Sequence, residues 1–374
     1  MRKIIRKTWI YPVLVIALIG ICYQAWLNHA DFERTMVGEA QAQLLIIAKS
    51  EAQSIEKYIG NINQELEILS SEFAVHQMLT GRYGRDEWKK YRQYLEGSYK
   101  DVEELVDSLY LVNANGTVVD VDPLNEEAIG RDFSGEPALK RAMQEGRPYT
   151  SSVFRLASGE LAIADLYPVI EEGKVIGLLR ADILVSRINN LLGHLNQGQE
   201  RRAFMIDNEK TLLGYRESSY LGKGVGVIIN DAPAEETRRR SERIIERMLA
   251  AEEGTDMLLL PAGDKAAGVK RILIAFAPVN IGSHTWSIAL MMDYRLISGP
   301  ISRNALDNLV FSGLILLILV ILGVSLYRIR KKEDESALSE AALNIINRQL
   351  HLEIDERRKI EEELLKSLRR RRPS

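Results

Sequence analysis

The residue types that carry most enzymatic chemistry are present in this chain, but their spacing predicts no active site. The single cysteine, Cys22, lies in an apolar run, which excludes an intrachain disulfide and a zinc site made of cysteines. The glycines Gly222, Gly224 and Gly226 are not followed by the Lys-Ser/Thr pair of a phosphate-binding loop, so they indicate a plain loop. No Ser-His-Asp order, supported pair of acids or His-Glu-x-x-His motif occurs. The histidines, which show no metal-ligand spacing, are His29, His76, His194, His284 and His351. We therefore predict that the chain is not an enzyme and needs neither a cofactor nor a metal.

The near-zero net charge bears on whether the chain binds nucleic acid. The 374 residues include 49 Lys and Arg against 52 Asp and Glu, a formal net charge of −3. Such a balance does not predict bulk nucleic-acid binding. The length allows one large or two ordinary domains.

Two apolar runs predict membrane-spanning helices, at residues 9–27 and 308–327. The nineteen residues of the first run would span roughly 28 Å as a helix, close to the thickness of a hydrocarbon core. Its aromatics lie near its ends, as interfacial aromatics do: Trp9, Tyr11, Tyr23 and Trp26. A cleaved signal peptide and a soluble core helix are the alternatives. The length of the first run and the lack of charge in the second favour two retained anchors.

Basic residues flank the two runs on the same side and predict the orientation. They are Arg2, Lys3, Arg6 and Lys7 before the first run, and Arg328, Arg330, Lys331 and Lys332 after the second. The positive-inside rule then places both termini in the cytoplasm and residues of about 28–307 outside the cell (inner) membrane.

A long helix is the first element expected outside the membrane, over roughly residues 31–79. Its apolar residues recur at mostly three- and four-residue steps: Leu44, Leu45, Ile47, Ile55, Ile59, Ile62, Leu66 and Leu69. The stripe could pack along the chain's own sheets or form a dimer interface, and both can hold at once.

Alternating apolar segments separated by turn residues follow this helix and predict antiparallel sheets. Asn115-Gly116 marks a hairpin within residues 109–121. The other predicted strands are 151–155, 160–169, 174–183, 203–206, 211–215, 255–260, 270–278 and 285–292, with a charged helix at 234–251.

After the second span, residues 337–368 have the pattern of a charged helix with an apolar stripe. The stripe is Leu343, Ile346, Leu350, Ile354, Ile360, Leu364 and Leu368, with a stutter in its spacing. This region resembles the signalling coil that precedes effector domains in membrane sensors, and it implies a parallel homodimer. About 45 residues cannot fold into a kinase or cyclase. The chain is therefore either a fragment of a longer receptor or signals through a separate cytoplasmic partner.

Four motifs in the first predicted sheet stand in the order of a known family: residues 111–118, 130–134, 167–169 and 173–179. This ordered set resembles the extracytoplasmic Cache sensor domain of bacterial and archaeal membrane signal-transduction receptors. A weaker copy at residues 204–289 indicates the double-Cache (dCache) form. The resemblance implies an α+β fold, in which two PAS-like antiparallel-sheet modules lie on a long N-terminal helix, between two transmembrane helices and before a C-terminal coiled coil. It also implies that a ligand binds in the membrane-distal module.

The predicted organisation joins these parts. It consists of a cytoplasmic basic N-terminus (1–8), a transmembrane helix (9–27), a long extracytoplasmic helix and lead-in (28–105), a membrane-distal module (106–197), a membrane-proximal module (198–307), a second transmembrane helix (308–327) and a cytoplasmic signalling coiled coil (328–374).

Amino-acid-binding members of the resembled family carry an Arg, an aromatic pair and an Asp at set distances from these motifs. This sequence has Glu136, Ala138, Leu139 and Arg155 at those positions, which argues against an amino-acid ligand. In one interpretation, the planar guanidinium of Arg155 binds the carboxylate of a small organic acid, and Glu136 and Asp165 position it or contact a ligand hydroxyl. In the other, Arg155 and Glu136 pair with each other and close the pocket. The predicted pocket walls are Tyr110, Phe154 and Tyr167.

The sequence thus predicts a membrane-bound sensor that transmits the binding of an external small molecule to a cytoplasmic coil, as in the input half of a two-component sensor histidine kinase. Its expected partners are that ligand, the lipid bilayer, a second copy of the chain and a cytoplasmic signalling protein, but not nucleic acid. The alternative is a membrane-tethered solute-binding or scaffold protein without signalling output.

Overall fold

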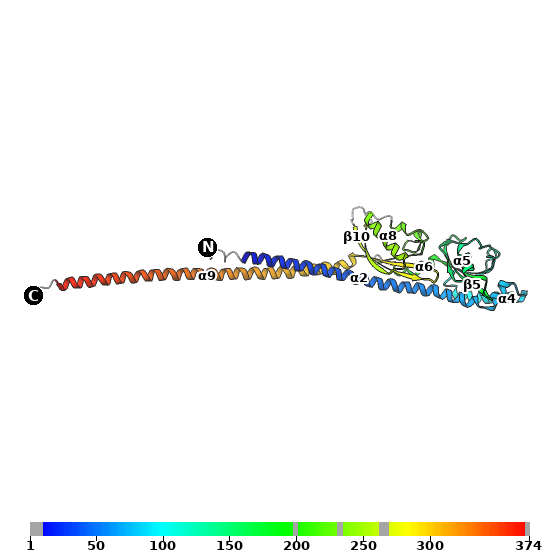
Figure 1. Cartoon of the computed structure of the whole chain (residues 1–374), viewed down its shortest axis with the longest axis horizontal. Helices are drawn as coiled ribbons and strands as arrows, with labels where there is room; N and C mark the ends of the chain where they lie inside the picture. The colour runs from blue at the N-terminus through cyan, green and yellow to red at the C-terminus, as the bar shows by residue number, and fades with distance from the viewer. Residues whose placement is uncertain (1–9, 197–200, 230–234, 262–268, 371–374) are drawn as a thin grey trace. The chain divides into compact units, whose positions relative to one another are not determined.

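The computed structural model describes residues 10–196, 201–229, 235–261 and 269–370 (Figure 1). The chain divides into two units. Residues 33–300 hold both sheets, and the second unit, residues 1–32 and 301–374, is helical over its described residues. The predicted cytoplasmic N-terminus, residues 1–8, lies outside the described residues.

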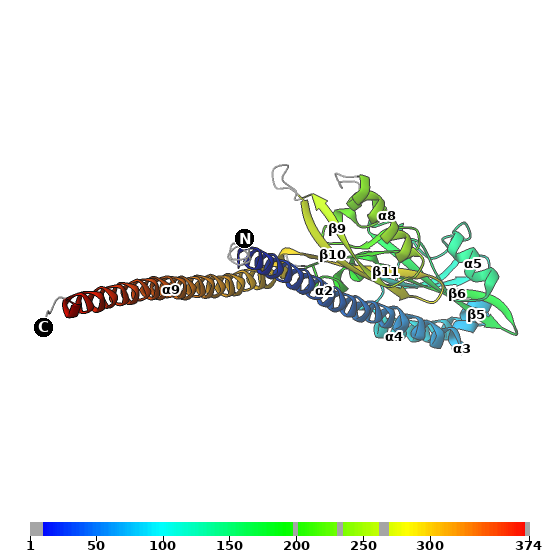
Figure 2. The ribbon, with the colours of Figure 1, turned by 60° about the vertical axis from the view of Figure 1, so that its left-hand side comes forward.

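Residues 33–70 of helix α2 (Ile10–Ser70) are the longest element of the larger unit, and they run along both sheets (Figure 2). The predicted apolar stripe faces these sheets, because Leu44, Ile55 and Ile62 are each no more than 1% exposed. Buried residues at three- and four-residue steps make one helix face a wall of the core. The stripe therefore packs on its own chain, as one of the two predicted arrangements requires.

The predicted helix over residues 31–79 is wrong at its C-terminal end, where the structure has a break. Ser70 Oγ donates to the carbonyl of Glu67 at 2.7 Å, and Ser71 Oγ donates to the carbonyl of Ile68 at 2.7 Å. Such local bonds compete with the backbone ladder and favour a helix end. The helices that follow are α3 (Phe73–Thr80) and α4 (Arg85–Val102).

The first module contains a six-stranded antiparallel sheet in the order β2-β1-β6-β5-β3, with β4 also paired to β5. Its elements are β1 (Ser108–Asn113), β2 (Val118–Asp122), α5 (Pro137–Glu145), β3 (Tyr149–Thr150), β4 (Phe154–Arg155), β5 (Leu161–Glu171), β6 (Lys174–Leu184) and α6 (Val185–Leu191). The predicted Asn-Gly hairpin is confirmed between β1 and β2. Gly116 there has φ +85°, and a Cβ on it would lie 2.7 Å from the Ser134 backbone, so the turn needs glycine.

The predicted strand over residues 151–155 is wrong in part, because within this range only β4 is a strand, and β3 ends before it at Thr150. Ser151 interrupts the ladder between them. Its Oγ accepts the N–H of Ala164 at 2.8 Å, so a side chain takes a bond that a continuous strand would give to its backbone.

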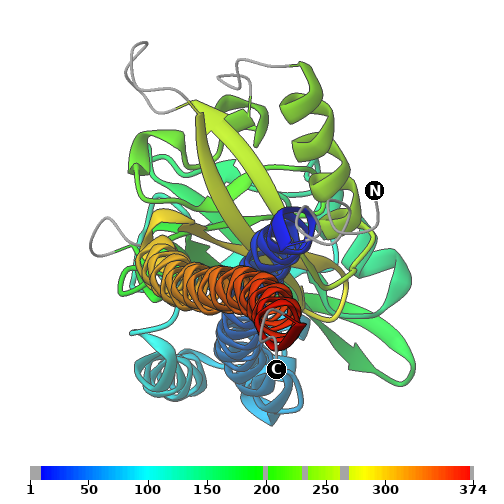
Figure 3. The ribbon, with the colours of Figure 1, turned by 90° about the vertical axis from the view of Figure 1, so that its left-hand side faces the viewer.

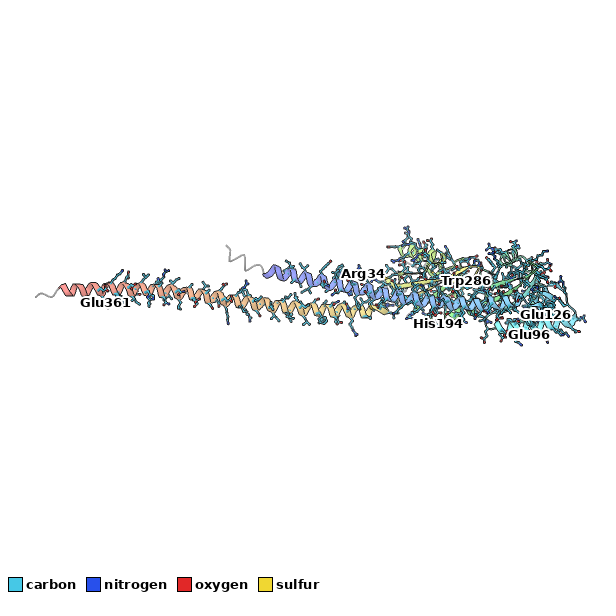
Figure 4. The ribbon with its side chains drawn as sticks, turned by 60° about the horizontal axis from the view of Figure 1, so that its bottom comes forward. Arg34, Glu96, Glu126, His194, Trp286 and Glu361 are labelled. Carbon is cyan, nitrogen blue, oxygen red and sulfur yellow. The ribbon has the colours of Figure 1, made fainter. Side chains whose placement is uncertain are left out.

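The second module contains a five-stranded antiparallel sheet in the order β8-β7-β11-β10-β9. Its elements are β7 (Arg201–Ile206), β8 (Leu212–Gly214), η1 (Ser218–Tyr220), α7 (Gly226–Ile229), α8 (Glu235–Leu249), β9 (Gly254–Pro261), β10 (Val269–Asn280) and β11 (Thr285–Asp293). One face packs in the cluster shared with α2, and the other packs under α8 (Figure 3). Trp286, 2% exposed, lies among the densely packed side chains of this module (Figure 4).

One residue separates the end of β11 from helix α9 (Arg295–Arg370), which includes the predicted second span and most of the predicted coil. Among the described residues, it is the one helix whose length and composition would allow it to cross a membrane. The predicted first span falls on α2, but its start is outside the described residues, and this span stays a prediction.

Candidate functional site

The two faces of the first sheet have different environments. Along β5, Ile163 belongs to the cluster shared with α2, whereas Ala164 and Leu166 pack against α5 in a separate cluster. Alternation along a strand produces this division. The α5 face belongs to the first module, in which the resemblance to sensor domains implies a ligand.

A buried arginine lies at the centre of the α5 face. Arg180 Nε donates to Asp182 Oδ1 at 2.7 Å, and Arg180 Nη1 donates to Glu136 Oε2 at 2.7 Å. The side chains of Arg180 and Asp182 are 3% and 1% exposed, whereas that of Glu136 is 39% exposed. Because both charged residues are two positions apart on β6, strand alternation places them side by side on one face.

Three aromatic rings surround this guanidinium. Its Cζ lies 4.3 Å from the ring centroid of Phe133, 5.0 Å from that of Phe154 and 5.5 Å from that of Tyr110. Aromatic faces attract a cation, and the attraction is stronger where water is excluded. We call these three rings with Arg180, Asp182 and Glu136 the Arg180 cluster.

Electrostatics keep the buried guanidinium charged. Burial alone would lower the pKa of Arg180, but the carboxylates of Asp182 and Glu136 outweigh burial and raise it. Burial raises the pKa of Asp182 to about 6, although its attraction to Arg180 opposes that change. A charged, forked donor inside an aromatic enclosure is suited to holding a carboxylate. In this structure, Glu136 supplies such a carboxylate from within the chain.

The structure brings Glu136, Tyr110 and Phe154 together, as the sequence predicted, but around Arg180 instead of Arg155. The predicted pair of Arg155 and Glu136 is wrong. Arg155 is exposed, and its Nη1 donates to the carbonyl of Gly159 in its own turn. Glu136 pairs with Arg180, 44 positions away.

Sequence reasoning missed Arg180 and Asp182, although a signal was available. They are the two charged residues within the otherwise apolar run of residues 175–184, and they share one face of the strand. Charges buried in a strand are rare unless they are paired or functional.

The remaining predicted site residues, Asp165 and Tyr167, lie on β5 and line a cavity of about 730 Å³ with residues of α2. The α2 residues include Ile59 of the shared cluster, so this cavity lies on the α2 side of the first sheet. The Arg180 cluster packs on the other face. The predicted residues therefore divide between two places. Among the described residues, no group of three or more potential metal ligands comes together.

Comparisons with solved structures show the same architecture in sensor domains. The ligand-binding domain of the Pseudomonas aeruginosa amino acid chemoreceptor PctC, in complex with GABA, is 18% identical with a TM-score of 0.51, over 68% of this chain and 100% of that one. The domain of the Pseudomonas fluorescens chemoreceptor CtaA, in complex with L-serine, is 16% identical with a TM-score of 0.51, over 69% and 99%.

An extracellular ligand-binding receptor from Desulfohalobium retbaense is 17% identical with a TM-score of 0.50 over 67% of this chain, which spans 40% of that receptor. At these identities, the likeness shows the fold alone. A sequence comparison with curated proteins gave no match. The family model described as Cache domain, in its double form, matches residues 32–301, well over half of the chain. The chain therefore belongs to the Cache domain family.

Proposed function

We propose that this chain is the membrane-tethered input part of a signal-transduction receptor, and that its first module senses a small organic acid outside the cell. The observation that carries this proposal is the Arg180 cluster. It is a charged guanidinium, 3% exposed, enclosed by three aromatic rings in a Cache module and paired with a half-exposed carboxylate. Solved relatives hold GABA or L-serine, which also carry a carboxylate.

Glu136 is the group that a ligand carboxylate would replace at Arg180. The side chain of Asp182 is 1% exposed beside the guanidinium, whereas that of Glu136 is 39% exposed. Glu136 is also the residue immediately before α5, whose first residue is Pro137. Release of its carboxylate would therefore free the start of α5. The ligand shifts this equilibrium by its difference in affinity for the two arrangements.

Two continuous elements support transmission of this change. Residues of both sheets pack in one cluster with α2, so rearrangement of the first module acts on the helix that also supports the second. Only Tyr294 separates β11 from α9. The coil stripe of α9 is exposed in the single chain, with Leu343 61% and Ile354 51% exposed, and this supports pairing with a second copy.

The proposed topology places Asn115 outside the cell and Leu343 in the cytoplasm. With Cys22 replaced by Ser, single cysteines at these positions can be labelled by an impermeant maleimide in intact cells. We expect labelling of Asn115→Cys only, because Asn115 is exposed in the first hairpin, and labelling of both after permeabilisation. Equal labelling of both in intact cells would rule out the topology.

The ligand proposal predicts opposite effects of two changes in the full-length chain in nanodiscs, titrated with organic acids, amino acids and amines. An acid that raises the unfolding midpoint of the wild type should bind roughly tenfold more weakly to Arg180→Lys, which retains the charge but loses the fork. It should bind several-fold more tightly to Glu136→Gln, because the internal competitor is weakened.

Arg155→Ala is the matched control, because Arg155 is exposed and bonds only its own turn in the contacts described. Its affinity for the acid should equal that of the wild type. The proposal fails if the acid binds the wild type, Arg180→Lys and Glu136→Gln equally well, or if amines alone stabilise the protein.

A further inference from the structure

The cavity of about 730 Å³ on the α2 side of the first sheet is separate from the Arg180 cluster, and we call it the junction cavity. Three parts of the larger unit enclose it: α2, the segment from α5 to β5 of the first module, and the turn between β10 and β11 of the second. The lining residues used below are Glu56, Gly60, Asn63, Glu67, Thr150 and Asp165.

Two acceptor atoms on its wall are buried without a donor among the described residues. Asp165 is 1% exposed, and its Oδ1 accepts from Thr150 Oγ1 at 3.0 Å, but its Oδ2 has no such partner. Asn63 Oδ1 on α2 is likewise buried without a donor. Buried acceptors are hydrogen-bonded in the great majority of cases, so a buried, unpaired oxygen on a side chain that lines a cavity indicates a missing donor.

The charges around the cavity favour a cationic donor. Four carboxylates line it against two arginines, and Arg141 already donates to Tyr149 Oη at 2.8 Å and lies 3.8 Å from Glu145. Burial lowers the pKa of His284, which keeps this ring mostly neutral at pH 7. The negative charge of the four lining carboxylates is therefore not balanced by the cations that line the cavity.

We propose that the junction cavity binds a small protonated amine, whose ammonium group donates to Asp165 Oδ2, with the amide oxygen of Asn63 as a further acceptor on the same wall. This site is independent of the organic-acid site proposed above, since Arg180 and Asp165 lie on opposite faces of the sheet. The space is sufficient for an alkylamine with several carbon atoms.

The position of this site gives its occupant access to both modules. Thr150, which donates to Asp165, also donates its backbone N–H to Ser283 Oγ of the second module at 3.0 Å. Glu56 on α2 accepts the backbone N–H of Asn280 at 2.6 Å. An ammonium bound to Asp165 therefore contacts the network that joins the first module, the second module and α2.

The test uses three probes with one carbon skeleton and three charges: butylammonium, 1-butanol and butanoate. Each is titrated into the full-length chain in nanodiscs at constant ionic strength and pH 8, where the Asp165 carboxylate, whose pKa burial raises to about 7, is ionised. Binding is measured by ligand-observed NMR. We expect a saturable signal for butylammonium, and at least tenfold weaker binding of the other two. Butylammonium should bind at least tenfold more weakly to Asp165→Asn, which keeps the acceptor for Thr150 but removes the charge.

A second variant keeps the test valid if Asp165→Asn alters folding. Gly60 lines the cavity, and a Cβ on it would meet no atom within 4 Å, so Gly60→Leu should fold and fill cavity space. It should abolish butylammonium binding. Gly97→Leu on α4 is the matched control, because Gly97 has the same open space but does not line the cavity.

Glu136→Gln separates this proposal from the organic-acid proposal, because it should change acid affinity and leave butylammonium affinity unchanged. Equal binding of the three probes, no saturable binding of butylammonium, or equal butylammonium affinity in the wild type, Asp165→Asn and Gly60→Leu would each overturn the proposal.

Discussion

Replacing Arg180 with Ala is expected to destabilise the protein by about 3–5 kcal/mol. The loss is large because Asp182, 1% exposed, would remain buried with no cation to balance its charge. The three rings that enclose the guanidinium would also border an empty volume. Tryptophan fluorescence during heating of the full-length chain in nanodiscs should show a midpoint lower by roughly 6–20 °C.

The double variant Arg180→Met with Asp182→Leu is the control for this interpretation. Apolar residues of similar volume remove both buried charges together, and such replacements are often neutral or stabilising. The double variant should therefore recover most of the lost stability while losing acid binding. An Arg180→Ala protein as stable as the wild type would show that the buried ion pair is not what holds this face together.

Asp165→Asn is expected to make the protein more stable at pH 8 and to have little effect near pH 4. Burial raises the pKa of Asp165 to about 7, with the bond from Thr150 opposing this only in part. The folded chain therefore keeps a proton up to about pH 7, while the unfolded chain releases it near pH 4. Raising the pH between these values favours the unfolded state. The difference of about three between the folded and unfolded pKa of Asp165 costs the wild type roughly 4 kcal/mol of folding free energy at pH 8. A neutral Asn has no proton to release, so the variant avoids this loss.

Chemical denaturation of both proteins between pH 4 and pH 8 measures this difference. Asp182 and Asp122 also have raised pKa values, each about 6, but they are present in both proteins, so subtraction isolates Asp165. The two stability curves should separate as the pH rises from 4 to 7 and then run parallel. Curves parallel over the whole range would mean that Asp165 is not held protonated by burial.

The fold was largely predictable because its signals are local. Alternation and turn residues located the strands, and the pair Asn115-Gly116 located the first hairpin. The predicted helix over residues 31–79 failed where two serines bond the preceding carbonyls. The strand predicted at residues 151–155 was wrong in part, because the side chain of Ser151 accepts the N–H of Ala164 on β5. Side-chain bonds of this kind depend on rotamers, which composition and periodicity do not specify.

The candidate site was less predictable because its contacts cross the sheet. Glu136 was chosen correctly as a partner for an arginine, but distance along the chain suggested Arg155, whereas the strand register puts Arg180 opposite Tyr110 on β1. The junction cavity was out of reach for the same reason. Asp165, Asn63 and the turn at residues 281–284 are far apart in the sequence and meet only after both modules pack on α2.

The unbroken course of α9 from residue 295 to residue 370 has a consequence for engineered receptors. Each residue added to a helix turns everything beyond it by about 100°. A fusion that joins this chain to a new output domain must therefore preserve the angular phase of the helix. Inserting or removing a multiple of seven residues at the junction should keep the output domain facing the same way. A change of two residues would turn it by about 200°, almost to the opposite side.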